Sequence, residues 1–455
     1  MPLILSGNVA SALPTGYDVA NSCRFDGTND YMVRSATGSS TESNNKWTFS
    51  CWVKRAKLGA EQMILDHRGS GNQFNIRFTG NDSIQAYDYV GGNLMQKDTN
   101  AEYRDPAAWY HILWSSDRSI GSPTTKLWVN GTEVTSFATD NEYSQDDTGA
   151  ANQNYDTWIG GENSSGSRLG AYLAEVVWLD GTFVSDATGF GEYDEDSPTI
   201  WKPIDPSGLT FGTNGYYFDF EASDNLGNDA NGGTDFSETG IASVDQATDT
   251  PTNNFCTINN LSGEPGTYTF SQGNCQIASG HTSWYTKGST MAVANGKWFW
   301  EVELDAGTMI EIMVGFHDTS VSLDGTNRWV TGSMVFYNDN GGEFRIDGVE
   351  TTANYGTLTA GDILGFALNM DDKQLTLYDN GSAIATNVSI GSNINEAMPT
   401  FLTDANDVVF KANFGGCSGF TVSSANQDGN GYGNFEYAVP SGYYALCTKN
   451  LAEYG

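Results

Sequence analysis

Positive charge is scarce in this sequence. Only 21 lysines and arginines accompany 56 aspartates and glutamates, so the formal net charge is −35 at pH 7. A surface of that sign repels a phosphate backbone, and no basic patch is visible along the chain, so we expect no nucleic-acid partner. Anionic membrane surfaces are disfavoured for the same reason. We interpret the acidity as a source of solubility and of tolerance to high salt, which screens surface repulsion.

Long apolar runs are missing as well. No stretch approaches membrane-spanning length, so we expect no membrane insertion. The first five residues have no basic start and only three consecutive apolar residues, which does not make a secretory signal. No helix longer than two turns is predicted. Instead 53 glycines and 13% aromatic residues interrupt short apolar runs, which predicts an all-β protein of two or three domains.

Metal-binding spacings and catalytic signatures are also scarce. The cysteines show none of the close pairs of zinc sites, so we expect free thiols at Cys23, Cys51, Cys256, Cys275, Cys417 and Cys447. Only Cys256 and Cys275 form a pair that could bridge a loop. The histidines occur singly, and we interpret them as structural or surface residues: His67, His111, His281 and His317. No nucleophile elbow, phosphate loop or dinucleotide fingerprint is present.

Residues 296–305 show the clearest strand pattern. Two sets of side chains alternate there, an apolar set and a charged set: Trp298, Trp300, Val302 and Leu304, then Lys297, Glu301, Glu303 and Asp305. Only Phe299 breaks the alternation. A turn at Ala306-Gly307 and a second alternating run at 310–316 predict an antiparallel pair with one apolar face, which a second layer must cover.

A similar arrangement follows in residues 364–381. Alternating apolar residues from Leu364 to Met370 precede a turn at 371–372, and the returning strand runs into Asn380-Gly381, a strong hairpin signal. Further pieces follow in order, at 399–401 and 412–415. Together these residues resemble the SPRY domain. The resemblance covers residues 256–415 and implies a bent antiparallel sandwich whose loops bind a partner, usually a protein, without catalysis.

The first part of the chain predicts a second sandwich. Ten short strands are expected, at 23–25, 31–34, 47–54, 63–66, 74–78, 84–89, 109–115, 126–130, 157–160 and 172–179. The motifs at 25–31, 49–54, 109–111, 127–131 and 173–176 are similar to the concanavalin A-like jelly roll of the laminin G type. This resemblance implies binding of glycans or proteins.

We therefore predict an all-β fold with two antiparallel β-sandwiches, a concanavalin A-like jelly roll and a SPRY-like sandwich. The predicted parts are an arm (1–20), the first sandwich (21–185), a Gly/Asp/Asn-rich connector (186–255), the second sandwich (256–420) and a C-terminal extension (421–455). Aromatic residues give the connector partial order but no core of its own. Its sequence and residues 440–447 resemble structural proteins of marine tailed phages.

Three acidic residues raise the alternative of catalysis. Facing carboxylates on a jelly-roll strand are how some glycoside hydrolases place their acid and nucleophile, and Glu301, Glu303 and Asp305 share one strand face. The hydrolase order Glu-x-Asp-x-x-Glu is absent, and an outward strand face is normally charged. We therefore expect structural carboxylates and no enzyme.

Binding residues are expected in the loops of the second sandwich. Aromatic side chains beside amide and guanidinium groups suit a glycan ring or a peptide, and the candidates are Trp284, Tyr285, Asp318, Asn327, Arg328, Trp329 and Tyr337. The alternative is that Trp284 and Trp329 plug the ends of the sandwich. Calcium is the cofactor that we consider, because one loop nearly follows a calcium-loop opening, with candidate ligands Asn426, Asp428, Asn430 and Glu436.

These observations predict a non-enzymatic phage virion structural protein, assembled in the host cytoplasm and placed on the particle surface as a tail fibre, another appendage or a capsid decoration. Its expected partners are a host-surface glycan or protein and other virion proteins. We expect a homo-oligomer, with a trimer as the first candidate. The alternatives are a polysaccharide-degrading glycoside hydrolase, which the missing signature disfavours, and a cellular adhesion protein, which the missing secretion signal disfavours.

Overall fold

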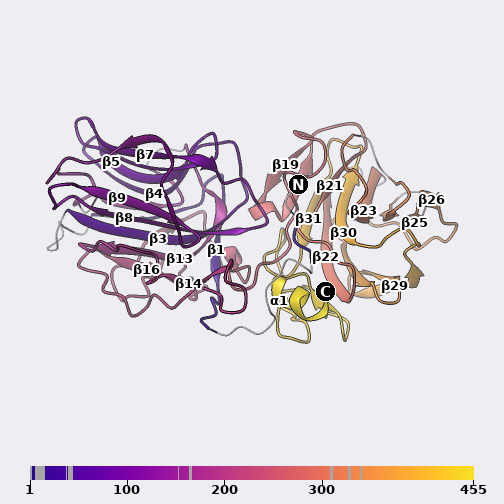
Figure 1. Ribbon diagram of the computed structural model, residues 1–455. Helices are drawn as coiled ribbons and strands as arrows, with labels where there is room; N and C mark the ends of the chain where they lie inside the picture. Colours follow the sequence, from indigo (N-terminus) through magenta and orange to yellow (C-terminus); the bar gives the residue numbers. More distant parts are fainter. Residues whose placement is uncertain are drawn as a thin grey trace. The chain divides into compact units, whose positions relative to one another are not determined.

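The computed structural model describes residues 3–5, 16–36, 38, 45–151, 153–162, 166–307, 311–325, 329–338 and 341–455. Strands hold 45% of the residues and helices 3%, which confirms the all-β fold class. The described residues of 16–252 form an N-terminal unit, and those of 253–455 form a C-terminal unit together with residues 3–5. Each unit is a sandwich of two main sheets (Figure 1).

The N-terminal unit contains all ten predicted strands. Its first sheet, the β3 sheet, has the order β10 (Thr132–Val134), β9 (Thr124–Val129), β8 (Trp109–Asp117), β3 (Lys46–Arg55), β13 (Gly170–Asp180), β1 (Ser22–Asp26) and β18 (Gln246–Ala247), and β16 (Tyr216–Phe218) pairs with β13. Its second sheet, the β5 sheet, has the order β11 (Phe137–Asn141), β7 (Asn93–Glu102), β6 (Ser83–Tyr89), β5 (Asn72–Phe78), β4 (Gln62–Gly69), β12 (Asp156–Ile159), β2 (Tyr31–Arg34) and β17 (Ser237–Thr239). The strands β14 (Gly191–Tyr193) and β15 (Trp201–Pro203) pair separately, and the short 3-10 helix η2 (Ser243–Asp245) precedes β18.

The core of this sandwich is rich in aromatic rings. Trp47, Phe49, Cys51 and Val53 alternate along β3 and belong to this core, and the residues between them are buried as well. Trp47 of β3 stacks on Trp178 of β13 at 5.6 Å, and Phe74 of the β5 sheet meets Trp47 edge-on at 4.7 Å. These contacts join the two sheets through geometries that aromatic rings favour.

The segment predicted as a connector packs on the N-terminal sandwich. Phe211 and Tyr217 cover Trp128 and other apolar residues on the outer face of the β3 sheet. The end of the segment is tied by two buried ion pairs, Lys54–Asp249 at 2.6 Å and Arg24–Asp245 at 2.7 Å. Residues as far along the chain as Asp249 therefore contribute to the first sandwich.

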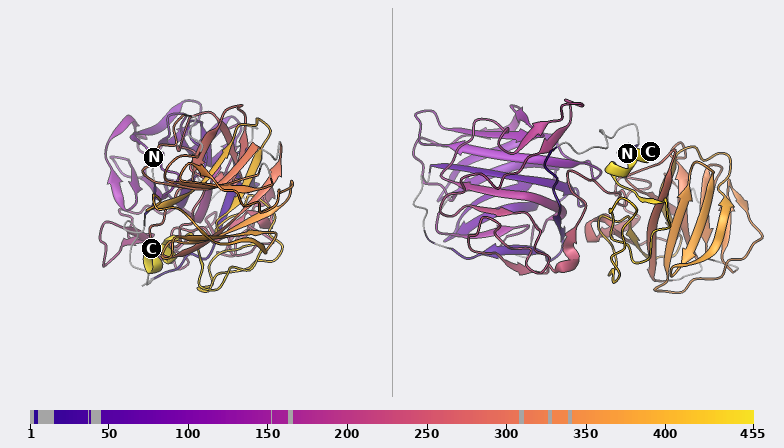
Figure 2. Two further views of the ribbon diagram at one scale, coloured as in Figure 1. Left: turned by 90° about the vertical axis from the view of Figure 1, so that its right-hand side faces the viewer. Right: turned by 90° about the horizontal axis from the view of Figure 1, so that it is seen from below.

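The C-terminal unit is the second sandwich. Its β22 sheet has the order β19 (Tyr268–Ser271), β20 (Gln276–Ser279), β31 (Val409–Asn413), β22 (Lys297–Ala306), β27 (Ile363–Asn369), β28 (Gln374–Asp379) and β29 (Ser382–Ser389), and β32 (Tyr444–Ala445) pairs in parallel with β22. Its β23 sheet has the order β21 (Tyr285–Gly288), β30 (Ala397–Thr403), β23 (Ile312–Asp318), β24 (Ser333–Tyr337), β25 (Glu343–Ile346) and β26 (Val349–Glu350). The 3-10 helix η3 (Gln272–Asn274) lies between β19 and β20, and the helix α1 (Thr448–Tyr454) ends the chain (Figure 2).

One predicted hairpin is wrong and another is confirmed. The runs at 297–305 and 310–316 were expected to pair, but β22 and β23 lie in different sheets, and Trp300 meets Phe316 across the core at 6.4 Å. Each strand has one apolar face. The two apolar faces meet across the core from opposite sheets, instead of lying side by side in one sheet. The hairpin of β27 and β28 is confirmed, and the next turn has positive φ at Asn380 (47°) and Gly381 (78°), which suits a two-residue Asn-Gly turn.

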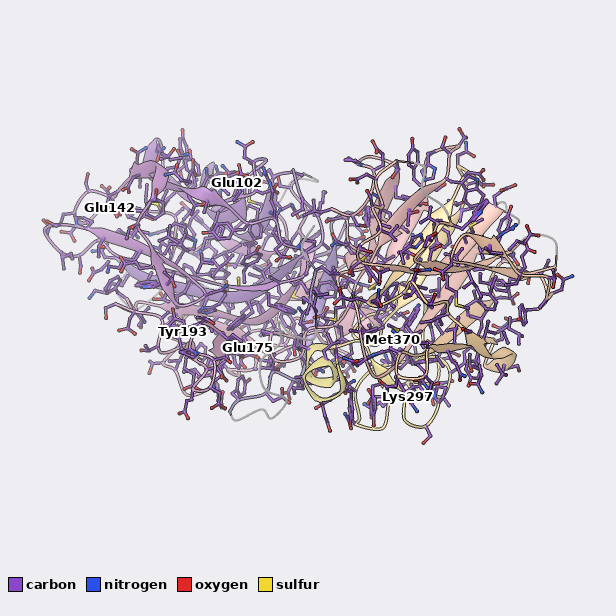
Figure 3. The ribbon with its side chains drawn as sticks, turned by 45° about the vertical axis from the view of Figure 1, so that its right-hand side comes forward. Glu102, Glu142, Glu175, Tyr193, Lys297 and Met370 are labelled. Carbon is purple, nitrogen blue, oxygen red and sulfur yellow. The ribbon has the colours of Figure 1, made fainter. Side chains whose placement is uncertain are left out.

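Both chain ends contribute to the C-terminal unit. Ile4, in the predicted arm, donates its N–H to Thr290 at 2.8 Å and forms a parallel bridge with Met291. The C-terminal extension covers the outer face of the β22 sheet, where Phe435 meets Phe299 edge-on at 5.2 Å. Lys297 and Met370 mark the end of this sheet nearest to α1 (Figure 3). None of the helices in the described part of the chain is long and apolar enough to cross a bilayer.

Candidate functional site

The outer face of the β23 sheet carries an aromatic cluster. Successive side chains of β23 and β24 point to opposite faces of the sheet, so those that do not enter the core lie on the outer face. We call the outward group the outer aromatic cluster: it consists of Trp284, Trp329 and Tyr337 packed over Met313, Val335 and Leu402. The structure thus brings together three of the seven predicted binding residues.

The three rings hold one another in defined orientations. Trp284 meets Trp329 edge-on at 5.9 Å and Tyr337 edge-on at 5.8 Å, and Trp329 stacks on Tyr337 at 6.2 Å. Trp284 and Tyr337 are buried, whereas Trp329 is half-buried. Trp329 therefore packs against two buried rings and remains partly exposed itself.

A guanidinium group that was not predicted from the sequence completes the cluster. Arg345 of β25 lies 5.1 Å from the Trp329 ring and 5.3 Å from the Tyr337 ring, within the range of cation–π attraction. Its ion pairs with Glu343, at 2.7 Å, and with Glu350 fix it in place. The pairing of Val335 with Arg345 puts both side chains on the outer face, and this register is not evident from the sequence.

The other predicted binding residues do not join this cluster. Tyr285 lies edge-on to His281 at 5.0 Å. Asp318 holds a turn, because its carboxylate accepts hydrogen bonds from the backbone N–H groups of Asn395 and Glu396. Desolvation opposes its ionisation, but these bonds and those from Ser320 outweigh it and lower the pKa of Asp318. Asn327 and Arg328 lie outside the described residues.

The acidic strand face differs from the expected outward face. Glu301 is fully buried, because the C-terminal extension covers it. Its carboxylate accepts hydrogen bonds from the N–H groups of Tyr437 (2.8 Å) and Glu436 (2.9 Å) and from Asn413 Nδ2 (3.1 Å). Burial raises the pKa of Glu301 to about 7, although these donors favour the ionised form. Glu301 thus fastens the C-terminal extension to β22.

The remaining two acidic residues of this strand share one cation. Lys411 Nζ lies 3.2 Å from a carboxylate oxygen of Glu303 and 3.2 Å from one of Asp305. These contacts tie β22 to its neighbour β31. The three carboxylates considered for hydrolysis therefore make structural contacts, and they do not face one another across an open cleft in the described structure.

The predicted calcium donors also make internal contacts. Both oxygens of Asp428 accept hydrogen bonds, two from the N–H groups of Asn430 and Tyr432 and one from that of Ala445. Glu436 accepts from Ser423, and Asn426 donates its amide to backbone carbonyls. Among the residues described, no group of three or more His, Cys, Asp and Glu side chains could hold a metal ion. Calcium binding at this loop stays a prediction, and it requires these hydrogen bonds to break.

His111 takes a structural position in the N-terminal unit. Trp201 donates its indole N–H to His111 Nδ1 at 3.1 Å, so the Nε2 that faces Ser50 Oγ at 2.8 Å carries the proton. Burial lowers the pKa of His111 to about 3, which keeps the ring neutral.

All six cysteines are free thiols, including Cys256 and Cys275.

A buried glutamate of β13 was not anticipated. Glu175, labelled in Figure 3, has a φ of 50° at a bulge where the register between β13 and β3 shifts. Its Oε2 accepts hydrogen bonds from the hydroxyls of Tyr217 at 2.7 Å and Tyr17 at 3.2 Å. Burial raises the pKa of Glu175 to about 8. The group links β13 to two segments that cover the outer face of its sheet.

Two protein-family models match the chain, one in each unit. The concanavalin A-like lectin/glucanases superfamily matches residues 26–186, and the SPRY domain matches residues 297–416. The chain therefore contains a concanavalin A-like domain of the laminin G type followed by a SPRY domain. No curated protein matches the sequence.

Solved structures with similarity to this chain include two SPRY domains. The SPRY domain of human HERC1 is 15% identical, over 34% of this chain and 96% of that chain, with a TM-score of 0.30. The PSpry domain of TRIM65 is 11% identical, over 35% of this chain and 89% of that chain, with a TM-score of 0.29. The domain assignment rests on the family models.

Proposed function

We propose that this chain is a non-enzymatic binding protein of a phage particle and that its SPRY domain holds a host-surface glycan or protein at the outer aromatic cluster. The observation that carries the proposal is the convergence of Trp284, Trp329 and Tyr337 with Arg345 on one sheet face. Tryptophan, tyrosine and arginine are the residues that most often dominate binding energy at interfaces.

The cluster is organised before a ligand arrives. Trp329 rests on Tyr337, and Arg345 is held by both rings and by two carboxylates, so little side-chain freedom is left to lose on binding. A sugar ring or a flat peptide side chain would stack on the accessible part of Trp329.

The assignment to a particle is supported by sequence resemblance and charge. Residues 201–255 and 440–447 resemble structural proteins of marine tailed phages, and the net charge of −35 suits a particle released into salt water. A tail fibre, another appendage or a capsid decoration, built as a homo-oligomer, fits these features. The structural contacts of Glu301, Glu303 and Asp305 support the non-enzymatic part of the proposal.

Ligand binding can be tested with a glycan array and with host envelope fractions. We expect Trp329→Ala and Arg345→Ala to weaken binding by at least about tenfold, the usual effect of truncating an interface anchor. Tyr193→Ala is the matched control, since this tyrosine is 44% exposed and lies in the other unit (Figure 3). Equal binding by all variants would overturn the proposed site.

The particle assignment has its own test. Mass spectrometry of gradient-purified virions should detect the chain, and antibodies should label intact particles. Absence of the chain from virions would refute the assignment. Release of sugars from algal or bacterial polysaccharides by the purified protein would favour a hydrolase instead.

A further inference from the structure

A second recess lies in the C-terminal unit, on the outer face of the β22 sheet and apart from the outer aromatic cluster. It has a volume of about 200 Å³, and its lining residues are Phe299, Gly365, Tyr378, Gly381, Tyr437 and Ala438. Phe299 at its base is buried, whereas Gly381 and Ala438 at its rim are exposed. Phe299 is an apolar side chain on the otherwise polar face of β22, and its ring lines this recess.

Two glycines keep the recess open. A Cβ at Gly365 would lie 3.2 Å from the Phe299 ring and 3.3 Å from Tyr378 Cβ, and a Cβ at Gly381 would lie 2.6 Å from the Tyr437 ring. Phe435 of the C-terminal extension holds Phe299 in place by an edge-on contact at 5.2 Å. The recess is thus walled by three aromatic side chains. It is smaller than a typical drug-sized site, which restricts it to a small chemical group.

The lining itself carries little polarity. Its side chains offer only the two phenol hydroxyls, and that of Tyr437 donates weakly to Asn380 Oδ1 at 3.4 Å. A primary ammonium, which has three N–H donors to satisfy, would find few acceptors here. A cation without N–H groups would lose no hydrogen bonds on entering.

The surroundings of the recess are negatively charged. Asp379 follows Tyr378 on β28 and therefore points to the other face of that strand, where its cross-strand partner is Leu364. Desolvation, then the charge of Asp362, raises the pKa of Asp379. The pKa of Tyr437 is raised by desolvation and then by four carboxylates: Glu436, Glu301, Asp379 and Asp362. Lys297 is the lysine of β22. It lies opposite Asn369 of β27, four residues along that strand from Gly365, and is therefore away from the recess.

We propose that this recess binds a quaternary ammonium group, with its methyl groups against Phe299, Tyr378 and Tyr437 and its charge balanced by the surrounding carboxylates. Aromatic faces attract such cations through the ring quadrupole, and the attraction grows when the site excludes water. This site is independent of the host-ligand site proposed above, because it lies on the other sheet of the sandwich and shares no residue with it.

Choline titrated into the full chain by calorimetry tests the site, with its neutral isostere 3,3-dimethylbutan-1-ol as the comparison. We expect choline to bind at least about tenfold more tightly than the isostere, because only choline gains the cation–π attraction. Equal binding of both compounds, or no binding of choline, would overturn the proposal. Glycerophosphocholine, a phosphodiester of choline, is titrated as a further ligand: binding equal to that of choline indicates a phosphodiester-linked headgroup, and weaker binding indicates the free cation.

Variants separate loss of the site from loss of the fold. Tyr437→Ala should weaken choline binding by about tenfold, and Tyr437→Phe should retain it, because the ring and not the hydroxyl is needed. Gly365→Ala should weaken binding by filling the base of the recess, with circular dichroism confirming an intact fold. Tyr193→Ala, in the other unit, should bind choline as the wild type does. Full binding by both Tyr437→Ala and Gly365→Ala would contradict the assigned location.

Discussion

At the scale of single residues, Glu301 combines burial with an altered titration. Burial raises its pKa from 4.5 to about 7 in the folded protein. The folded state therefore binds this proton more tightly than the unfolded state does. As a result, its contribution to the free energy of unfolding is complete below pH 4.5 and is lost as the pH rises through 7.

Glu301→Gln should remove this dependence, because glutamine does not titrate. The difference in unfolding free energy between wild type and variant should change by up to about 1.4 kcal/mol per pH unit between the two pKa values and be constant outside them. Denaturant titrations across this pH range measure it. Glu303→Gln, which alters the neighbouring pair with Lys411, is the control. A difference for Glu301→Gln that does not vary with pH would contradict the raised pKa.

The cysteines give a second prediction at this scale. Five of the six free thiols are buried. Desolvation raises the pKa of Cys51, and that of Cys447 to about 12, so little thiolate is present at neutral pH. A thiol reagent should therefore modify Cys417 first in the native protein and all six cysteines in denaturant without reductant. Four or more unreactive cysteines in denaturant would show disulfides instead.

At the scale of structural elements, residues 186–252 complete the first sandwich. A fragment of residues 16–252 should unfold in one cooperative transition, whereas a fragment of 16–185 should aggregate. The shorter fragment exposes Trp128 and its apolar neighbours and leaves Lys54 without Asp249, and an unpaired buried charge costs about 3–5 kcal/mol. Circular dichroism and gel filtration compare the two. Equal melting temperatures would show that the segment is dispensable.

Sequence patterns predicted most elements whose buried face is apolar. The strand β7 was missed because only Met95 among its inward residues is apolar, while Lys97 and Thr99 are also buried. The pairing of β22 with β23 was predicted wrongly, because periodicity identifies an apolar face but not the sheet in which it lies.

The candidate site was predicted only in part. Aromatic character singled out Trp284, Trp329 and Tyr337, but the place of Arg345 depends on the register of β24 and β25. The burial of Glu301 depends on backbone N–H groups of residues 436 and 437, more than 130 positions later in the sequence. Such long-range contacts have no local signature in the chain.

At the scale of the whole molecule, negative charge dominates. A net charge of −35 opposes the compact state through mutual repulsion, and added salt screens this repulsion. The melting temperature should therefore rise when sodium chloride increases from about 0.01 M to about 1 M, where the Debye length falls from about 30 to about 3 Å. Scanning calorimetry measures the change. A melting temperature that falls with salt would show that the ion pairs outweigh the repulsion.

The most direct test of the proposed function is inhibition of phage adsorption by the purified chain. Host cells are incubated with wild-type protein, Trp329→Ala or Tyr193→Ala, and the rate at which purified phage disappears from solution is measured. The wild type and Tyr193→Ala should slow adsorption by occupying the host ligand, and Trp329→Ala should not. Unchanged adsorption with the wild-type chain, or equal inhibition by Trp329→Ala, would contradict host binding through the outer aromatic cluster.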